Sequence, residues 1–242
     1  MEISIIIPTL NEEKNIEKCL KSVINQDFPR EKYELIISDG CSRDKTVQIA
    51  RKYANKVFVA KSKGVWYGRN YGAKFAKGKY LVFVDADTYL DPNYLGTVYH
   101  YLLKGYAGLS TGFRFSGNEF RIRMAEAFSN FYYSTKAFLG QDNLLGFSLC
   151  VSKKDFEKVG GFKNLGLEDT GICDDLKKVG KVKFIGRKLV TNSSRRLEET
   201  GVWNSLRYYF DLWLIQKMNV NPKKSGIIKN NSFKAFTSIK VK

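Results

Sequence analysis

The chain has 242 residues, 43% of them hydrophobic, and a formal net charge of +17. This length accommodates one α/β domain with a substantial core, and no stretch reaches the roughly 20 apolar residues that a membrane-spanning helix needs. The charge predicts attraction to nucleic acid, anionic lipid or a phosphate-rich substrate. A lysine-rich composition that only maintains solubility would give the same value.

The first residues and the cysteines both indicate a cytosolic protein. The chain opens at Met1 with neither a basic leader nor a small-residue cleavage site, so we expect no signal peptide. Cys19, Cys41, Cys150 and Cys173 form no CxxC pair, which argues against a zinc site or a redox motif. We expect them to be reduced and to act as small apolar fillers.

Residues 1–84 alternate between short β-branched runs and amphipathic segments. The predicted strands are 3–8, 33–38, 57–60 and 80–84, and the predicted helices are 11–25, 44–53 and 67–76. This alternation predicts an α/β fold with a Rossmann-like, mostly parallel central sheet and helices on both faces. In such sheets ligands bind beyond the carboxyl ends of the strands.

The later part of the chain is less regular and predicts a mixed continuation of the sheet. Strand-forming segments lie at 105–117, 149–151 and 183–185, helix-forming segments at 120–138, 153–159 and 169–179, and a loop at 140–148. The segment 201–218 closes the folded part. The one histidine, His100, falls in a helix-like stretch and is expected to be a surface or structural residue.

Three polar loops follow three of the predicted strands. They are residues 8–12 (PTLNE), 39–42 (DGCS) and 85–87 (DAD). A single acid after a strand often only caps the next helix. Three such loops at the carboxyl edge of one sheet predict instead a shared polar site.

Asp85 and Asp87 are candidate metal ligands. Two carboxylates that leave a buried strand two residues apart can face one pocket, and carboxylate oxygens suit Mg²⁺ or Mn²⁺. Such a cation would stabilise a diphosphate as a leaving group. The Asp-x-Asp pattern is common by chance, so its position directly after the strand 80–84 is what supports this reading.

In their order along the chain, these motifs resemble the family 2 glycosyltransferases, which have the GT-A fold. The matching segments are 4–12, 39–46, 68–72, 85–87, 160–162 (GGF) and 168–169 (ED). The resemblance covers roughly residues 4–185. It implies an inverting transferase that moves a sugar from a nucleotide-diphosphate donor to an acceptor hydroxyl by a single displacement.

The resemblance also implies a role for each matching residue. The donor would be bordered by Pro8, Thr9, Glu12, Asp39, Arg69 and Asp85. Asp87, with Asp85, would hold Mn²⁺ or Mg²⁺. Asp169 would be the general base, and the neighbouring Glu168 would raise its pKa. Taken alone, this acidic pair could equally be a first helical turn that suits the helix dipole.

Two further points stay open at this stage. Arg195 and Arg196 are candidates for holding phosphate through their guanidinium groups, with a solvated basic turn as the alternative. The acidic segment departs from many relatives at Gly171, Asp174 and Asp175. This departure leaves open which carboxylate is the base.

The end of the chain is aromatic and basic. Residues 202–218 carry Trp203 and, from Leu206 to Ile215, eight further large apolar or aromatic side chains. From Lys217 to Lys242 there are seven lysines and no acidic residue. This composition suits a membrane interface and anionic lipid, or packing on the domain or on a second subunit. We therefore expect a peripheral protein at the inner face of the cell membrane, with a lipid-linked or surface-glycan acceptor.

These expectations give one domain and an appendage. Residues 1–200 would form the catalytic domain, with a nucleotide-sugar half to about residue 90 and an acceptor half from 91 to 200, and residues 201–242 would be the appendage. Three alternatives are a nucleotidyltransferase, a nucleic-acid-binding protein and an inactive nucleotide-binding relative. The first lacks support, because the 8–12 loop is not Gly-rich and basic. We expect no nucleic-acid partner, and a homo-oligomer stays open.

Overall fold

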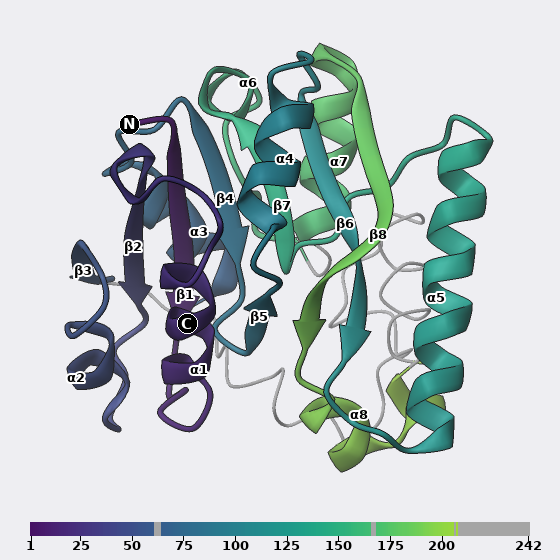
Figure 1. Cartoon of the computed structure of the whole chain (residues 1–242), viewed down its shortest axis with the longest axis horizontal. Coiled ribbons are helices and arrows are strands. Elements are labelled where there is room, and N and C mark those ends of the chain that lie inside the picture. Colours follow the sequence, from purple (N-terminus) through teal and green to yellow (C-terminus); the bar gives the residue numbers. More distant parts are fainter. Residues whose placement is uncertain (61–63, 166–167, 206, 208–242) are drawn as a thin grey trace.

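One eight-stranded sheet organises the computed structural model, which describes residues 1–60, 64–165, 168–205 and 207 (Figure 1). Its strands are β1 (Ile3–Thr9), β2 (Tyr33–Asp39), β3 (Lys56–Val59), β4 (Tyr80–Val84), β5 (Thr88–Leu90), β6 (Gly108–Phe115), β7 (Ser148–Ser152) and β8 (Val182–Asn192). Their order is β3-β2-β1-β4-β7-β6-β8-β5. Only β5 and β7 pair antiparallel to their neighbours, so the predicted mostly parallel sheet is confirmed.

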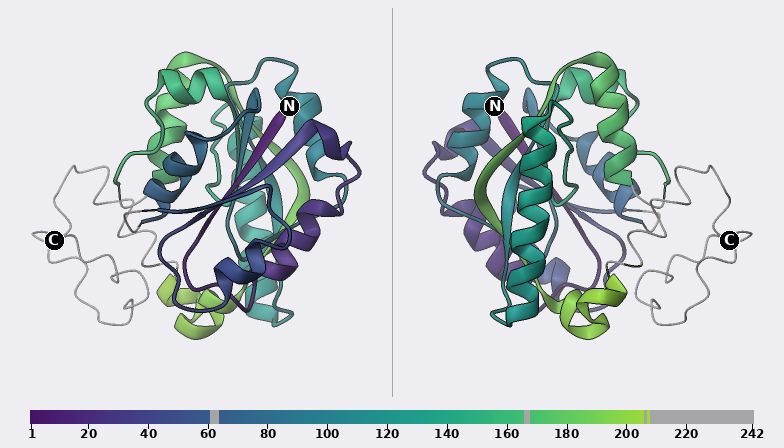
Figure 2. Two further views of the ribbon diagram at one scale, coloured as in Figure 1. Left: turned by 90° about the vertical axis from the view of Figure 1, so that its left-hand side faces the viewer. Right: turned by 90° about the vertical axis from the view of Figure 1, so that its right-hand side faces the viewer.

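Helices cover both faces of this sheet (Figure 2). One face carries α1 (Ile16–Ile24), α2 (Thr46–Ala50) and α4 (Tyr94–Leu102), and the other carries α3 (Val65–Ala73), α6 (Lys153–Lys158) and α7 (Glu168–Val179). The 19-residue helix α5 (Phe120–Phe138) packs on β6 and β8, on the right of Figure 1. The short elements η1 (Arg30–Lys32) and α8 (Arg195–Thr200) complete the fold.

The two cores follow from the alternation of side chains along each strand. In β1, Ile5 and Ile7 enter the core under α1 and α4, whereas Ile6 enters the core under α3 and α7. In β4, Val82 faces the first core and Phe83 the second. All five side chains are fully buried, so truncation of any of the three isoleucines to alanine should cost about 2–5 kcal/mol.

The strand order reverses between β1 and β4, which are neighbours in the sheet. The chain moves outward from β1 to β2 and β3, and then returns to the other side of β1 through α3. Such a switch point leaves a crevice at the carboxyl ends of the two central strands. The loops after β1 and β4 therefore lie side by side, as the sequence predicts.

Helix α1 begins at Ile16, five residues later than predicted. The prediction was wrong there because the backbone N–H groups of residues 11–13 donate to side chains of the next loop: Asn11 to Ser42, Glu12 to Thr46 and Glu13 to Asp44. These bonds satisfy the backbone outside a helix. The first polar loop is thus fixed to the second one.

Strand β8 is much longer than the predicted 183–185 segment. Its pairing with β6 slips in register between Thr111 and Phe113, opposite the exposed residues Gly186 and Arg187. This irregularity places polar residues inside a strand and hides it from a pattern based on alternation. Strand β5 was not predicted because it has only three residues, and helix α8 was not predicted because it is short and polar. Except for residues 201–205 and 207, the predicted appendage 201–242 lies outside the described residues.

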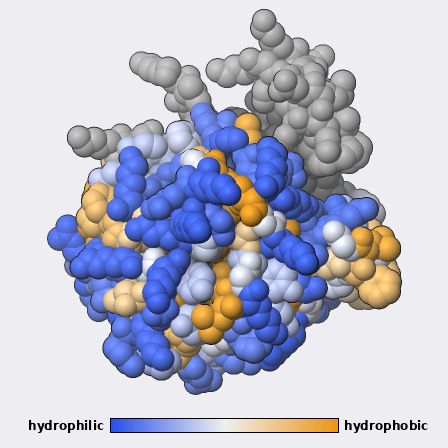
Figure 3. Space-filling model, turned by 90° about the horizontal axis from the view of Figure 1, so that it is seen from above, coloured by the Kyte–Doolittle hydropathy of each residue, from blue (hydrophilic) through white to orange (hydrophobic). Residues whose placement is uncertain are grey.

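The surface is mostly hydrophilic from above, with an apolar patch at the right edge, where α5 stands in Figure 1 (Figure 3). Among the helices that the structure describes, none combines the length and apolarity needed to cross a bilayer.

Candidate active site

Arg69 of α3 joins the two halves of the site. Its side chain is only 3% exposed. Nη2 donates to Oδ1 of Asp85 at 2.8 Å and to the carbonyl oxygen of Gly146 at 3.1 Å, while Nη1 donates to Oε1 of Glu168 at 3.1 Å. The guanidinium also lies 5.0 Å from the ring centre of Phe162. One buried cation thus ties the end of β4 to the start of α7.

Two glycines allow α3 to bring Arg69 this close. A Cβ at Gly72 would lie 2.6 Å from Cγ2 of Ile6, and one at Gly68 would lie 3.0 Å from Cβ of Pro8. Larger residues would push the helix away from β1 and β2. Pro8 consequently packs against α3, and its predicted contact with the donor stays a prediction. The GRNYG segment at residues 68–72 therefore has a packing reason for its glycines.

Asp169 and Glu168 lie at the first turn of α7, half-buried. Oδ2 of Asp169 accepts from the backbone N–H of Gly146 at 3.3 Å, and Oδ1 accepts from that of Thr170 at 2.9 Å. Burial raises the pKa of Asp169, although the positive charge of Arg69 opposes the shift. Burial likewise raises the pKa of Glu168 against the effect of Arg69. The two predicted catalytic carboxylates are thus adjacent, but only Glu168 is ion-paired.

Gly146 is a site residue that the sequence reasoning missed. A Cβ there would lie 3.0 Å from Cβ of Asp169 and 3.2 Å from both terminal nitrogens of Arg69. Its peptide group contacts both residues, through its carbonyl oxygen and its N–H. A glycine in the predicted loop 140–148 was the only signal, and such a signal is too common to single out one position.

Beyond Asp85, the guanidinium of Arg195 lies next to the carboxylates of Glu12 and Asp87. Nη2 of Arg195 donates to Oε1 of Glu12 at 2.9 Å and lies 3.8 Å from Oδ2 of Asp87. Burial, together with the negative charges of Asp85 and Glu12, raises the pKa of Asp87 to about 6, while Arg196 and Arg195 oppose the shift. The predicted phosphate-binding arginines therefore lie beside the predicted metal ligand, at the start of α8.

The donor set at Asp87 fits a cation that is shared with a ligand. Among the residues that the structure describes, no three Asp, Glu, His or Cys side chains are grouped to hold a metal. Mg²⁺ commonly takes one or two carboxylates and completes its shell with water and substrate phosphates. Burial and the negative charges of Asp85 and Glu12 disfavour the ionised form of Asp87, and the two arginines offset this effect only in part. A divalent cation would relieve the remaining repulsion. Asp85 has one oxygen engaged by Arg69.

Asp39 and Thr9 hold the loops behind this cluster. Asp39 is buried and accepts from Oγ1 of Thr9 at 3.0 Å, from Ser42 N at 2.8 Å and from Ser42 Oγ at 2.5 Å. The loop after β1 is also bonded to the loop after β2 through Asn11, whose side chain accepts from Arg43 N at 2.8 Å. The carboxylate of Asp39 is thus largely occupied by protein donors. Its predicted contact with a nucleotide stays a prediction.

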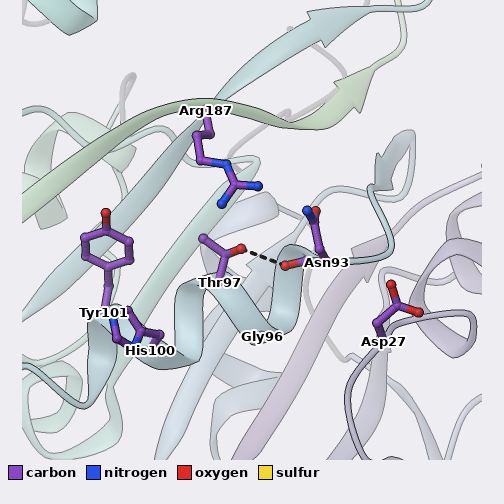
Figure 4. Close-up of a pocket in the computed structure, with 7 residues that line it drawn as sticks. All are labelled: Asp27, Asn93, Gly96, Thr97, His100, Tyr101 and Arg187. Carbon is purple, nitrogen blue, oxygen red and sulfur yellow. Dashed lines mark hydrogen bonds between the residues drawn. The ribbon is translucent and has the colours of Figure 1, made fainter.

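A hollow of about 490 Å³ lies elsewhere, beside α4 (Figure 4). It is lined by Asp27, Asn93, Gly96, Thr97, His100, Tyr101 and Arg187. None of the predicted site residues lines it. Figure 4 shows Arg187 above α4 and Asp27 to the right of the helix, and Asp27 is the one carboxylate among the residues drawn. We therefore place the candidate site at the switch point between β1 and β4.

Comparisons with known proteins identify the family of the chain. The sequence model of the family described as "Glycosyl transferase family 2" matches residues 4–152. The chain is 40% identical over 97 residues to the poly(ribitol-phosphate) beta-N-acetylglucosaminyltransferase TarS of Staphylococcus aureus, covering 38% of this chain and 17% of that protein. It is 39% identical over 100 residues to a dolichyl N-acetyl-alpha-D-glucosaminyl phosphate 3-beta-D-2,3-diacetamido-2,3-dideoxy-beta-D-glucuronosyltransferase of Methanococcus voltae, covering 38% of this chain and 31% of that protein. The chain matches less than a third of the length of each of these relatives.

Solved structures show the same fold. Residues 1–349 of S. aureus TarS, in complex with UDP-GlcNAc, superpose with a TM-score of 0.65 at 22% identity, covering 80% of this chain and 58% of that one. The mannosyltransferase PcManGT from Pyrobaculum calidifontis, in complex with GDP-Man and Mn²⁺, gives a TM-score of 0.66 at 21% identity, covering 79% and 56%. The predicted GT-A fold is confirmed.

Proposed function

The chain belongs to glycosyl transferase family 2, and from that premise we propose that it is an inverting, metal-dependent glycosyltransferase. It would move a hexosyl or N-acetylhexosaminyl group from a nucleotide-diphosphate donor to an acceptor hydroxyl. The observation that carries this proposal is the arrangement of carboxylates around Arg69. Asp85 and Glu168 are fixed by the same guanidinium, which sets a donor-side acid and the base-bearing turn at a defined separation.

The donor would bind between Asp87 and Arg195. Asp87, with Asp85 beside it, would hold Mn²⁺ or Mg²⁺, and this cation would neutralise the diphosphate as it leaves. Arg195 and Arg196 would bind phosphate oxygens from the other side. The raised pKa of Asp87 supports this assignment, because it reflects burial of the carboxylate together with the negative charges of Asp85 and Glu12. The relatives in complex with UDP-GlcNAc and with GDP-Man and Mn²⁺ also support it.

Asp169 would act as the base. The acceptor oxygen attacks the anomeric carbon, the bond from that carbon to the diphosphate oxygen breaks, and the hydroxyl proton passes to Asp169. One displacement inverts the anomeric configuration. Asp169 suits this role better than Glu168, because its oxygens accept only backbone N–H groups whereas Glu168 is held by Arg69. The raised pKa of Asp169 makes it a stronger proton acceptor.

The acceptor would be a surface glycan or a lipid-linked glycan. The names of the relatives support this class, because one acts on poly(ribitol-phosphate) and another on a dolichyl-linked sugar phosphate. A protein with such an acceptor would work at the inner face of the cell membrane, as a peripheral protein of the cytoplasm. The net charge of +17 would favour both the polyphosphate chain and the anionic surface.

Calorimetric titration of UDP and GDP, each with and without Mn²⁺, tests the donor site. We expect metal-dependent binding of one nucleotide, with binding lost in Asp87→Ala and retained in Asp169→Asn. Asp169→Asn should instead abolish sugar transfer, because the amide cannot take up the proton. Asp27→Asn is the matched control, since Asp27 is an exposed acid in the separate hollow beside α4.

Two results would contradict the proposal. Binding of neither nucleotide, with or without metal, would favour an inactive relative or a nucleic-acid-binding protein. Sugar transfer that persists in Asp169→Asn would show that another group takes the proton, with Glu168 as the next candidate.

A further inference from the structure

Helix α5 exposes a row of large apolar side chains to solvent. Phe128 is 68% exposed, Phe131 70% and Phe138 90%. The complete row is Phe120, Met124, Phe128, Phe131, Tyr132 and Phe138. Their spacing places all six on one side of the helix, and the polar residues Arg121 and Thr135 fall on the same side. Figure 3 shows apolar atoms at this edge of the molecule.

The opposite side of α5 fixes its orientation. Asn130 is buried there, and its side chain accepts from Phe113 N at 3.0 Å and donates to Phe113 O at 2.9 Å. Glu126 is buried as well and accepts from Phe115 N at 2.9 Å and from Lys188 at 2.7 Å. These bonds to β6 and β8 prevent the helix from turning its apolar row inward. Figures 1 and 2 show the outer side of α5 facing away from the sheet.

A row of this size is an unusual feature of a monomer surface. Single exposed apolar residues are normal, but a contiguous apolar patch usually marks a surface that binds something. The 19-residue helix is about 28 Å long, at 1.5 Å per residue. The patch therefore forms a straight, convex ridge, which suits a plane better than a pocket.

The charges around the ridge indicate what kind of flat surface it would bind. Arg121 and Lys136 flank it on the helix, and the acid within α5, Glu126, is already paired with Arg123 and Lys188. A second copy of the chain would carry the same net charge of +17, and the two copies would repel each other. An anionic lipid surface would be attracted, with roughly 1 kcal/mol gained per basic residue close to it.

We propose that α5 lies flat on an anionic lipid bilayer, with its row of phenylalanines inserted among the headgroups. Aromatic side chains with flanking basic residues are typical of helices at this depth, which is about 5–10 Å. The ridge begins beside the candidate site: a Cβ at Gly117, three residues before α5, would lie 2.7 Å from Oγ of Ser194, the residue before Arg195. A lipid-held acceptor would thus meet the rim of the sheet. The docking itself does not depend on sugar transfer.

Co-sedimentation of the full chain with vesicles tests this docking. The vesicles are phosphatidylcholine, with and without phosphatidylglycerol, and the variant is Phe128→Ser with Phe131→Ser. We expect the wild-type chain to bind the anionic vesicles, and the variant to bind them at least about tenfold more weakly, as the loss of two buried apolar side chains implies. Leu103→Ser is the matched control, because Leu103 is 60% exposed at the end of α4 and should leave binding unchanged.

The basic stretch 217–242 would bind anionic vesicles by charge alone. The co-sedimentation is therefore repeated near 1 M salt, where the Debye length is about 3 Å and electrostatic binding is screened. If α5 inserts, the wild-type chain should still bind the vesicles at this salt concentration, and the double variant should not. Equal binding of the wild-type chain and the variant at both salt concentrations would overturn the proposal. So would a dimer in light scattering, without lipid, that the double variant abolishes. Circular dichroism of the variant checks that it is folded, and Phe138→Ser provides a second, independent variant.

Discussion

Arg195 donates to Glu12 at 2.9 Å, although 183 residues separate them in the chain. The contact brings the start of α8 against the loop after β1, and it places a guanidinium 3.8 Å from Asp87. Three charged side chains from three distant segments therefore share one small volume. Their balance decides how readily this part of the site accepts a cation or a phosphate.

Arg195→Ala should change the affinities for metal and nucleotide in opposite directions. Removal of the positive charge beside Asp87 should strengthen binding of Mn²⁺ alone, by a few-fold. Nucleotide binding in the presence of Mn²⁺ should weaken about tenfold or more, since a charge-assisted hydrogen bond contributes about 1.5–3 kcal/mol. Paramagnetic resonance of Mn²⁺ and calorimetry measure the two effects. A parallel loss of both affinities would mean that Arg195 only supports the fold.

Arg69→Lys should disable the site more severely than its conservative character suggests. A single ammonium cannot reach Asp85, Glu168 and the Gly146 carbonyl with the geometry of the guanidinium fork. We expect a loss of about 3–5 kcal/mol in unfolding free energy, as for a broken buried ion pair, and a loss of kcat of at least about a hundredfold.

Arg114→Lys is the control for that change, because Arg114 pairs with Asp91 at 3.0 Å in a half-exposed position. It should cost less than about 1 kcal/mol and leave kcat unchanged. Denaturant unfolding and steady-state kinetics measure both variants. Wild-type kcat in Arg69→Lys would contradict the role given to the fork.

Gly146→Ala should lower kcat and leave nucleotide binding nearly unchanged. The added Cβ would press on Asp169 and on the guanidinium of Arg69, and a shift of the base by about 1 Å can cost about a hundredfold in rate. The comparison variant is Gly96→Ala in α4, where a Cβ meets only Asp27 O at 4.0 Å. That change should add about 0.5–1 kcal/mol of stability without a kinetic effect. Equal kinetics for both variants would remove Gly146 from the site.

Glu34 should control part of the acid denaturation. Burial alone would raise its pKa, but Lys56, the backbone N–H of Lys77 and the hydroxyl of Ser4 together hold the pKa below its usual 4.5. The folded pKa is therefore lower than the unfolded one. The stabilisation is complete above the unfolded value and is lost as the pH falls through the folded value.

Glu34→Gln tests this linkage by urea unfolding between neutral and acidic pH. At neutral pH the variant should be less stable by about 1–3 kcal/mol, because Lys56 loses its acidic partner. Its unfolding free energy should then fall less steeply than that of the wild type as the pH drops below 4.5. Parallel curves for the two proteins would refute the linkage.

Local pattern was enough to predict most elements of the first half of the chain. The strands β1, β2 and β4 were predicted almost to the residue, since buried parallel strands are short apolar runs with few alternatives. Helix α1 was predicted too long, because its first turn is replaced by bonds to Ser42, Thr46 and Asp44. Those partners lie on another loop, and no local signal reports them.

The sequence by itself indicated the family, through the order of its motifs along the chain. It also determined the parallel part of the sheet and the acids at its edge, because apolar periodicity and the position of polar loops after strands are local properties. Only the tertiary structure decided what those acids do to one another. Arg69 pairs with Asp85 and Glu168, Gly146 fits between Arg69 and Asp169, and Arg195 reaches Glu12. Electrostatic and steric contacts depend on distances of a few ångströms, and spacing along a chain does not specify such distances.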